Sequence, residues 1–260
     1  MPQSELEILD QDGIRELRMN RPPSNALSRS LLDLIKEAAK AAGQDAGVRA
    51  VLLSSAIPKY FSSGLDVNEF SPGDARAQRE LFTAMVSAHR ALADCPKPVV
   101  AASCGAALLG GFILSLGCDV RLLSSERGRV SLSELRLGLS PTSPILRQVA
   151  ALSASPGAVN ELILKAKTLS ASEALAAGLV DRVFPEADFA AAARREAKAL
   201  AGAAPKAYAS VKRARRALVM GPDEESAWAQ GRRELEEILS GAELQEGISA
   251  LQEKRRPRWP

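Results

Sequence analysis

Residues 97–122 read KPVVAASCGAALLGGFILSLGCDVRL, and this stretch decides the fold. No residue from Pro98 to Cys118 carries a charge, which suggests a membrane span at first sight. A spanning helix needs ~20 predominantly apolar residues, whereas a proline, two serines and four glycines interrupt this run. Residues 98–103 are typical of a buried strand, 104–111 of a loop and 111–117 of a short helix. We therefore expect a soluble fold at this point and no membrane helix.

The bulk composition agrees with a soluble protein. The chain has 260 residues, of which 46% are hydrophobic, 25% charged and 4% aromatic, so its core is expected to be aliphatic. A formal net charge of +3 does not indicate a nucleic-acid partner. Three cysteines without CxxC spacing favour a reducing compartment, and the first ten residues lack the features of a signal peptide. We expect a cytoplasmic location and no membrane association.

Strand and helix signals alternate over the first 150 residues, which predicts an α/β architecture. Two strand-like runs flank Asp12-Gly13 and predict a hairpin, and Ser28 is placed to cap the helix that follows. The remaining signals are strands at 48–55, 98–103, 119–124 and 128–132 and a helix over 74–93, with a polar loop before that helix. After a short strand at 179–184 the chain becomes helical. We expect a core over residues 1–200 and a helical region over residues 201–260 that packs on a neighbouring subunit.

Several catalytic chemistries are excluded by the residues present. His89 is the only histidine, and its place on the apolar side of a predicted helix favours a packed or hydrogen-bonded role over a catalytic one. The sequence has no G-x-S-x-G, HExxH, Walker A or GxGxxG motif and no Cys/His cluster with the spacing of metal ligands. Carboxylates and backbone amides remain as the groups that could act on a substrate.

Five segments in order resemble the crotonase superfamily of enoyl-CoA hydratases and isomerases. They are MNRPPSNALS (19–28), YFSSGLDVNEF (60–70), the opening stretch (97–122), RVSLSELRLGLSP (129–141) and TLSASEALAAGLVDRVFP (168–185). The resemblance implies a spiral of ββα units with a helical C-terminal region that builds homotrimers or hexamers. It also implies acyl-CoA thioester substrates and an enolate held in an oxyanion hole.

The resemblance assigns the two oxyanion-hole donors to the backbone N–H groups of Leu65 and Gly110. Gly111 then gives the loop room to approach the thioester, as glycine can. The loops expected to bind the CoA moiety, mostly through backbone atoms, contain Asn25, Ala26, Leu27, Ser62, Ser63, Gly64, Asp66, Val67 and Asn68. No metal is expected, and no cofactor beyond the coenzyme A of the substrate.

The acid–base residue implied by the resemblance is Glu134. Hydratases of the family hold a water between two glutamates, but here Ile113 occupies the position of the first. An apolar residue at the first position and a glutamate at the second is the pattern of mitochondrial-type Δ3,Δ2-enoyl-CoA isomerases, which this chain resembles. In those enzymes the glutamate moves a proton from C2 to C4 of the substrate. In peroxisomal-type isomerases the base follows a Ser-Pro pair, where this chain has Thr142. Ile113 is expected to line the acyl tunnel with Leu109, and Phe82, Met85 and His89 are further candidates.

Other functions stay open at this point. Hydration, thioester hydrolysis and decarboxylation are alternatives within the superfamily, and an RNA-binding or non-catalytic homologue is an alternative of another class. The basic stretches 211–217 and 253–260 are typical of solvated surface, and the alternative for them is contact with the CoA phosphates.

Overall fold

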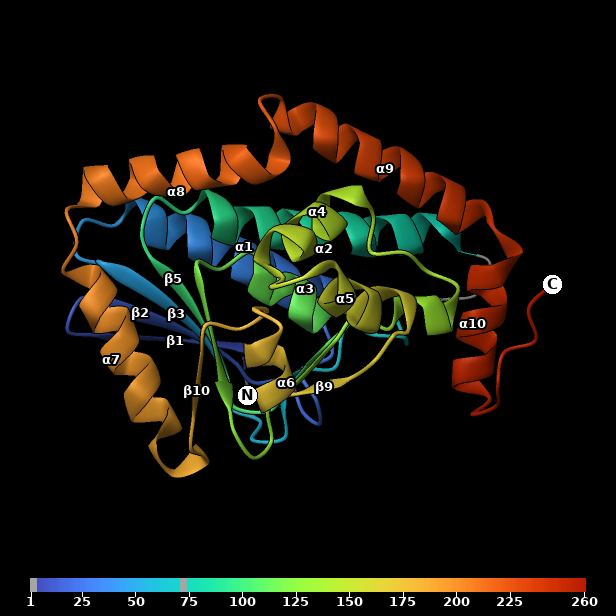
Figure 1. Cartoon of the computed structure of the whole chain (residues 1–260), viewed down its shortest axis with the longest axis horizontal. Helices are drawn as coiled ribbons and strands as arrows, with labels where there is room; N and C mark the ends of the chain where they lie inside the picture. Colours follow the sequence, from blue (N-terminus) through green and yellow to red (C-terminus); the bar gives the residue numbers. More distant parts are fainter. Residues whose placement is uncertain (1–3, 71–73) are drawn as a thin grey trace.

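Two sheets carry the fold in the computed structural model, which describes residues 4–70 and 74–260 (Figure 1). The first sheet contains, in spatial order, β1 (Leu6–Gln11), β2 (Ile14–Met19), β3 (Ala50–Ser55), β5 (Val99–Ser103), β7 (Val120–Ser124) and β10 (Arg182–Phe184). The second contains β4 (Tyr60–Ser62), β6 (Ala106–Leu108), β8 (Arg129–Ser131) and β9 (Leu169–Ser170). The predicted α/β class is thereby confirmed.

Helices cover both faces of the first sheet. The helical elements are α1 (Arg29–Gln44), α2 (Ala75–Asp94), α3 (Gly110–Leu116), η1 (Glu134–Leu137), α4 (Ser143–Leu152), α5 (Pro156–Val159), η2 (Asn160–Leu164), α6 (Ala171–Ala176), η3 (Glu186–Asp188), α7 (Phe189–Ala201), α8 (Pro205–Met220), α9 (Glu224–Ser240) and α10 (Ala242–Gln252). Val51 and Leu53 of β3 belong to the core shared with α1 and α2, whereas Ala50 and Leu52 pack with α7. Burial on both faces explains why β3 is a continuous apolar run.

Two local predictions at the amino-terminal end are confirmed. β1 and β2 pair antiparallel, with Gln11 opposite Ile14 across the Asp12-Gly13 turn. Ser28 caps α1, because its Oγ accepts a hydrogen bond from the N–H of Leu31 at 3.0 Å. The polar loop expected before α2 contains the short strand β4, and the loop's residues 71–73 lie outside the described residues.

The uncharged run from Pro98 to Cys118 forms two strands and a seven-residue helix. β5 and α3 are where the sequence predicts them, but the expected loop over 104–111 is wrong at its centre, where Ala106–Leu108 form β6. β6 lies between β4 and β8, parallel to both. No helix in residues 4–70 and 74–260 is long and apolar enough to cross a membrane.

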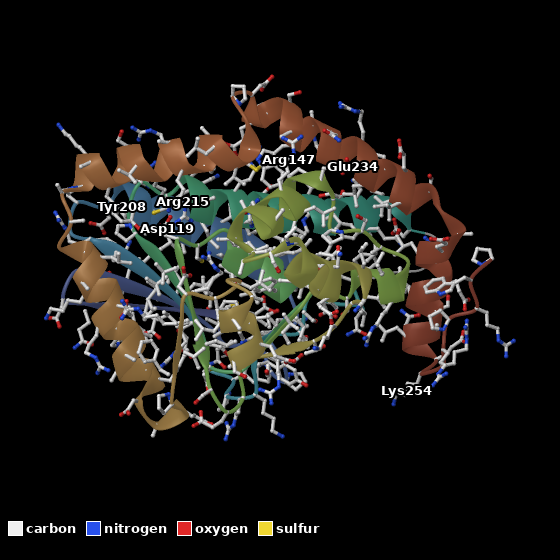
Figure 2. All side chains as sticks on the ribbon, in the orientation of Figure 1. Asp119, Arg147, Tyr208, Arg215, Glu234 and Lys254 are labelled. Atoms are coloured by element: carbon white, nitrogen blue, oxygen red, sulfur yellow. The ribbon has the colours of Figure 1, made fainter. Side chains whose placement is uncertain are left out.

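The carboxy-terminal helices pack on their own chain. Figure 1 shows α8 and α9 along one long side of the molecule, with α10 at the end of α9. Lys212 of α8 places its Nζ 2.8 Å from the Oδ2 of Asp119, and both side chains are about nine-tenths buried. Figure 2 labels Asp119 beside Tyr208 and Arg215 at this end of α8. Part of the basic stretch 211–217 thus holds α8 against the sheet.

Candidate active site

Three neighbouring parallel strands bring the predicted catalytic groups together. Leu65 follows β4 by three residues, Gly110 follows β6 by two and Glu134 follows β8 by three. Because β4, β6 and β8 are adjacent and parallel, their carboxyl ends lie along the same edge of the second sheet. Ligands of α/β sheets bind beyond such carboxyl ends. The topology therefore places a site at this edge.

The two predicted oxyanion-hole amides are free and close to each other. In the described part of the chain, the N–H groups of Leu65 and Gly110 donate to no protein acceptor. A Cβ built on Gly110 would lie 3.5 Å from the backbone nitrogen of Leu65. Leu109 begins the turn before α3 with φ 50° and ψ −127°, a conformation that non-glycine residues rarely adopt. Two unpartnered amides beside a strained residue are the geometry of an anion-stabilising pocket.

Gly111 is required by the close packing of α3 on β4. A Cβ at this position would lie 2.6 Å from the carbonyl oxygen of Ser62, a distance that no side chain tolerates. The first turn of α3 can therefore rest against the end of β4, which holds the Gly110 amide beside that of Leu65. The close contact at Gly111 is thus with β4, and its role in the approach to a thioester stays a prediction.

A cavity of about 660 Å³ opens between these amides and Glu134. Its wall near the amides includes Leu65, Gly110 and Ile113, and its aromatic and aliphatic wall includes Phe82 and Met85 of α2. The volume lies within the ~300–1,000 Å³ common for small-molecule sites. A largely apolar space with two backbone donors suits an acyl thioester, whose carbonyl needs donors and whose tail needs none.

Glu134 is a buried acid without a partner. It begins η1, its residue is 6% exposed, and neither carboxyl oxygen accepts a hydrogen bond from any described residue. Burial raises the pKa of Glu134 to about 8, and the smaller opposing effect comes from its own backbone N–H. A carboxyl group with a pKa near the working pH can both accept and return a proton.

This shift predicts a pH-dependent stability that Glu134→Gln removes. The folded pKa of about 8 exceeds the ordinary value of 4.5, so protonated Glu134 stabilises the fold fully below pH 4.5, and the contribution falls as the pH rises towards 8. One pH unit corresponds to about 1.4 kcal/mol. Between pH 5 and pH 8, the free energy of unfolding of the wild type should therefore fall by roughly 4 kcal/mol relative to that of the variant. Urea unfolding at both pH values measures this difference, and parallel curves would contradict the assignment.

Two further ionisable side chains on the cavity wall, Asp66 and His89, are respectively paired and neutral. Burial raises the pKa of Asp66, but a hydrogen bond from the Asn68 N–H and the Arg21 guanidinium 2.5 Å away lower it more, so the pKa is below its usual value. Burial lowers the pKa of His89 to about 4, although its hydrogen bond with the Ile113 carbonyl opposes this. Asp66 is therefore a paired carboxylate and His89 a neutral packed histidine, as its helix position predicts.

Some of the predicted binding residues line the cavity and others hold its loops. The cavity wall includes Ala26, Ser63, Leu65, Asp66, Val67, Asn68, Leu109, Gly110, Ile113, Glu134 and Thr142. Asn25, Leu27, Ser62, Gly64 and Gly111 lie behind this wall, in the described part of the chain. Asn25 donates to the Phe61 carbonyl at 3.1 Å and Ser62 donates to the Asn25 carbonyl at 2.7 Å. These hydrogen bonds thus tie the loop after β2 to β4 itself.

The carboxy-terminal helices form a wall that the sequence did not indicate. Trp228 and Leu235 of α9 and Ile248 of α10 line the cavity, so the site extends beyond the predicted core of residues 1–200. α10 crosses η1 closely, since a Cβ on Gly247 would lie 2.2 Å from the Leu137 carbonyl oxygen. The apolar faces of α9 and α10 were the only sequence feature that could have indicated this wall. An apolar helix face, however, does not show which surface it covers.

Residues 10–260 match the family model described as enoyl-CoA hydratase/isomerase. Carnitinyl-CoA dehydratase of Salmonella typhi is 31% identical over 260 residues, covering 95% of this chain and 94% of the relative. An enoyl-CoA hydratase structure from Mycobacterium avium subsp. paratuberculosis K-10 has a TM-score of 0.84 and 28% identity, with full coverage of both chains. An enoyl-CoA hydratase/isomerase structure from Pseudoalteromonas atlantica T6c has the same TM-score and identity, covering 99% of this chain and 100% of the other.

Proposed function

The chain belongs to the enoyl-CoA hydratase/isomerase family, and we propose that it converts 3-enoyl-CoA thioesters to 2-trans-enoyl-CoA thioesters. One observation carries the proposal: Glu134 is a buried, unpaired carboxyl group on the cavity wall, and the position of a second family carboxylate is the apolar Ile113. Isomerisation needs one group that takes a proton and gives it back, which Glu134 alone can do.

The proposed reaction moves one proton within the substrate. The Glu134 carboxylate removes a proton from C2, and the C–H electrons shift into the thioester to give a dienolate. The N–H groups of Leu65 and Gly110 donate hydrogen bonds to its oxygen, which carries the new negative charge. Glu134 then returns the proton at C4, the carbonyl re-forms, and the double bond lies between C2 and C3. The product therefore has the same composition as the substrate.

Hydration is less well supported by the residues on the cavity wall. Adding water across a double bond requires a group that activates the water in addition to the group that protonates C2. Ile113 has no ionisable group, and the Asp66 carboxylate is held by Arg21. The described wall therefore offers one carboxyl group for proton transfer, which fits a shuttle.

Dehydration of a 3-hydroxyacyl thioester is the second candidate, because carnitinyl-CoA dehydratases are 31% identical to this chain. It also begins with removal of the C2 proton. Glu134 would then have to give that proton to the departing hydroxyl group rather than to C4. Isomerisation and dehydration use the same base and the same oxyanion hole. The substrate that the cavity accepts therefore decides between them.

We also propose an assembly and a metabolic setting for the enzyme. Val211 and Leu218 of α8 are 67% and 86% exposed and lie on one side of the helix, as residues seven apart do. An exposed apolar face favours assembly as a homotrimer or hexamer. The small-molecule partner of the proposed enzyme is its acyl-CoA substrate. We place the enzyme in cytoplasmic fatty-acid oxidation.

Offering the full-length protein three substrates separately tests the proposal. We expect a 3-enoyl-CoA to be converted to the 2-trans isomer. Hydration of a 2-enoyl-CoA should be at least about a hundredfold slower than this isomerisation, because hydration lacks a second acid–base group, which contributes 10²–10⁴-fold. The third substrate is carnitinyl-CoA. Chromatography with mass detection follows each product. Robust hydration, or turnover of carnitinyl-CoA alone, would overturn the proposed isomerisation.

A further inference from the structure

Two aromatic side chains separate the catalytic cavity from a second one. The second cavity has a volume of about 210 Å³, and His89 and Trp228 line both it and the 660 Å³ cavity. His89 comes from α2 and Trp228 from α9, and their residues are 1% and 4% exposed. Their ring centroids lie 5.7 Å apart with the planes at 63°. The two rings therefore form a partition between the cavities.

The partition is fixed on the His89 side by hydrogen bonds at both ring nitrogens. Nδ1 lies 2.8 Å from the Ile113 carbonyl oxygen, so Nδ1 carries the hydrogen and donates it. Nε2 then accepts from the Gln148 side-chain amide, whose nitrogen is 3.2 Å away. A ring held at both nitrogens cannot turn aside without leaving a buried polar atom unpaired.

Trp228 is fixed by its own contacts and by those of α9. Its Nε1 donates to Glu224 Oε1 at 2.9 Å, and the Arg90 guanidinium lies 5.6 Å from the ring centroid. Further along α9, Glu234 accepts a hydrogen bond from the N–H of Ser143 at 2.7 Å. Figure 2 labels Glu234 where α9 passes over α4. Both the ring and its helix are thus anchored.

The catalytic cavity is apolar on the way to the partition, and space continues behind it. Phe82, Met85 and Ile113 line the near side, which favours a hydrocarbon tail. Leu116, Leu152, Val219 and Met220 line part of the far side. Charged side chains line the rest, among them Arg215 and the ion pairs of Lys212 with Asp119 and of Arg216 with Glu224. At ~30 Å³ for each water-sized group, the second cavity could hold about seven such groups.

We propose that the His89–Trp228 partition ends the acyl-binding space and sets the longest acyl chain that the protein accepts. The inference rests on the proposed use of this cavity for acyl-CoA thioesters. A chain short enough to stop at the rings gains affinity with each buried methylene, by about fourfold per group. A longer chain must fold back or expose carbon to water. Removing one ring joins the two cavities and lengthens the space.

The test is equilibrium binding of saturated acyl-CoA thioesters of 4–16 carbons to the full-length protein, measured by titration calorimetry. We expect wild-type affinity to rise with chain length and then to fall beyond a limit. In Trp228→Ala the limit moves to longer chains, and the longest thioesters bind about sixteenfold more tightly, at about fourfold for each of two further buried methylenes. Leu239→Ala is the matched control, because Leu239 is a buried α9 residue outside both cavities; it should keep the wild-type limit.

Every outcome decides the inference. An unchanged limit in Trp228→Ala, or a wild type without a limit up to 16 carbons, overturns it. If Trp228→Ala does not fold, as judged by circular dichroism, Trp228→Leu keeps apolar contacts in α9 while removing the wide ring, and the same shift is required. Saturated thioesters cannot isomerise, so a shifted limit without isomerase activity would sink the proposed reaction alone. Absence of any acyl-CoA binding would overturn both.

Discussion

Glu134→Gln should lower kcat for a 3-enoyl-CoA by about 10³-fold or more, because the base in both proton transfers is lost. General acid–base groups contribute 10²–10⁴-fold, and here one group serves twice. Glutamine has nearly the same shape and adds no charge, so the cavity and the affinity for a saturated acyl-CoA should change little. Steady-state kinetics and titration calorimetry measure the two effects separately.

The same variant tests the chemistry without reference to the final product. If Glu134 removes the C2 proton, the wild type exchanges that proton of a saturated acyl-CoA with deuterium from the solvent, whereas Glu134→Gln does not. Glu237→Gln is the matched control, since Glu237 is an exposed residue of α9. Exchange that persists in Glu134→Gln would exclude Glu134 as the base for either candidate reaction.

The sequence predicted the elements that have a strong local signature. The hairpin at Asp12-Gly13, the Ser28 cap and the continuous apolar strand β3 each follow from a few neighbouring residues. The prediction of a loop at Ala106–Leu108 was wrong because this segment has no such local signature. Three residues between glycine-rich stretches have too little periodicity to indicate a strand, and β6 exists because β4 and β8 lie on either side of it.

The site was predictable in part. The resemblance to the crotonase superfamily implied Leu65, Gly110 and Glu134, and the structure adds that they follow adjacent parallel strands. The wall contributed by Trp228 and Ile248 could not be predicted, because an amphipathic helix shows which of its faces is buried but not the surface that it meets. The sequence assigned these helices to a neighbouring subunit, whereas they also close their own cavity.

Gly110→Ala should abolish most activity while leaving the fold intact. The added Cβ would lie 3.4 Å from Leu27 Cδ1, 3.5 Å from Met85 Sδ and 3.5 Å from the Leu65 nitrogen, all ordinary contacts. Alanine is also favoured over glycine in a helix by up to ~1 kcal/mol. The methyl group, however, occupies the space between the two amides that the enolate oxygen needs. Loss of one such donor lowers kcat by about 10²–10³-fold.

Opposite changes in stability and activity separate this effect from general damage. We expect thermal unfolding of Gly110→Ala at or above the wild-type temperature, together with the loss in kcat. Gly157→Ala is the matched control, because Gly157 is exposed in α5 and a Cβ there meets nothing closer than the Ser155 Oγ at 3.6 Å; its kcat should equal that of the wild type. The infrared carbonyl band of a bound saturated acyl-CoA gives the direct test. Two donors polarise the thioester carbonyl and lower its frequency, so the band in Gly110→Ala should return towards its position in water. A wild-type band position combined with low kcat would mean that the methyl group obstructs Glu134 or the tail rather than the oxyanion hole.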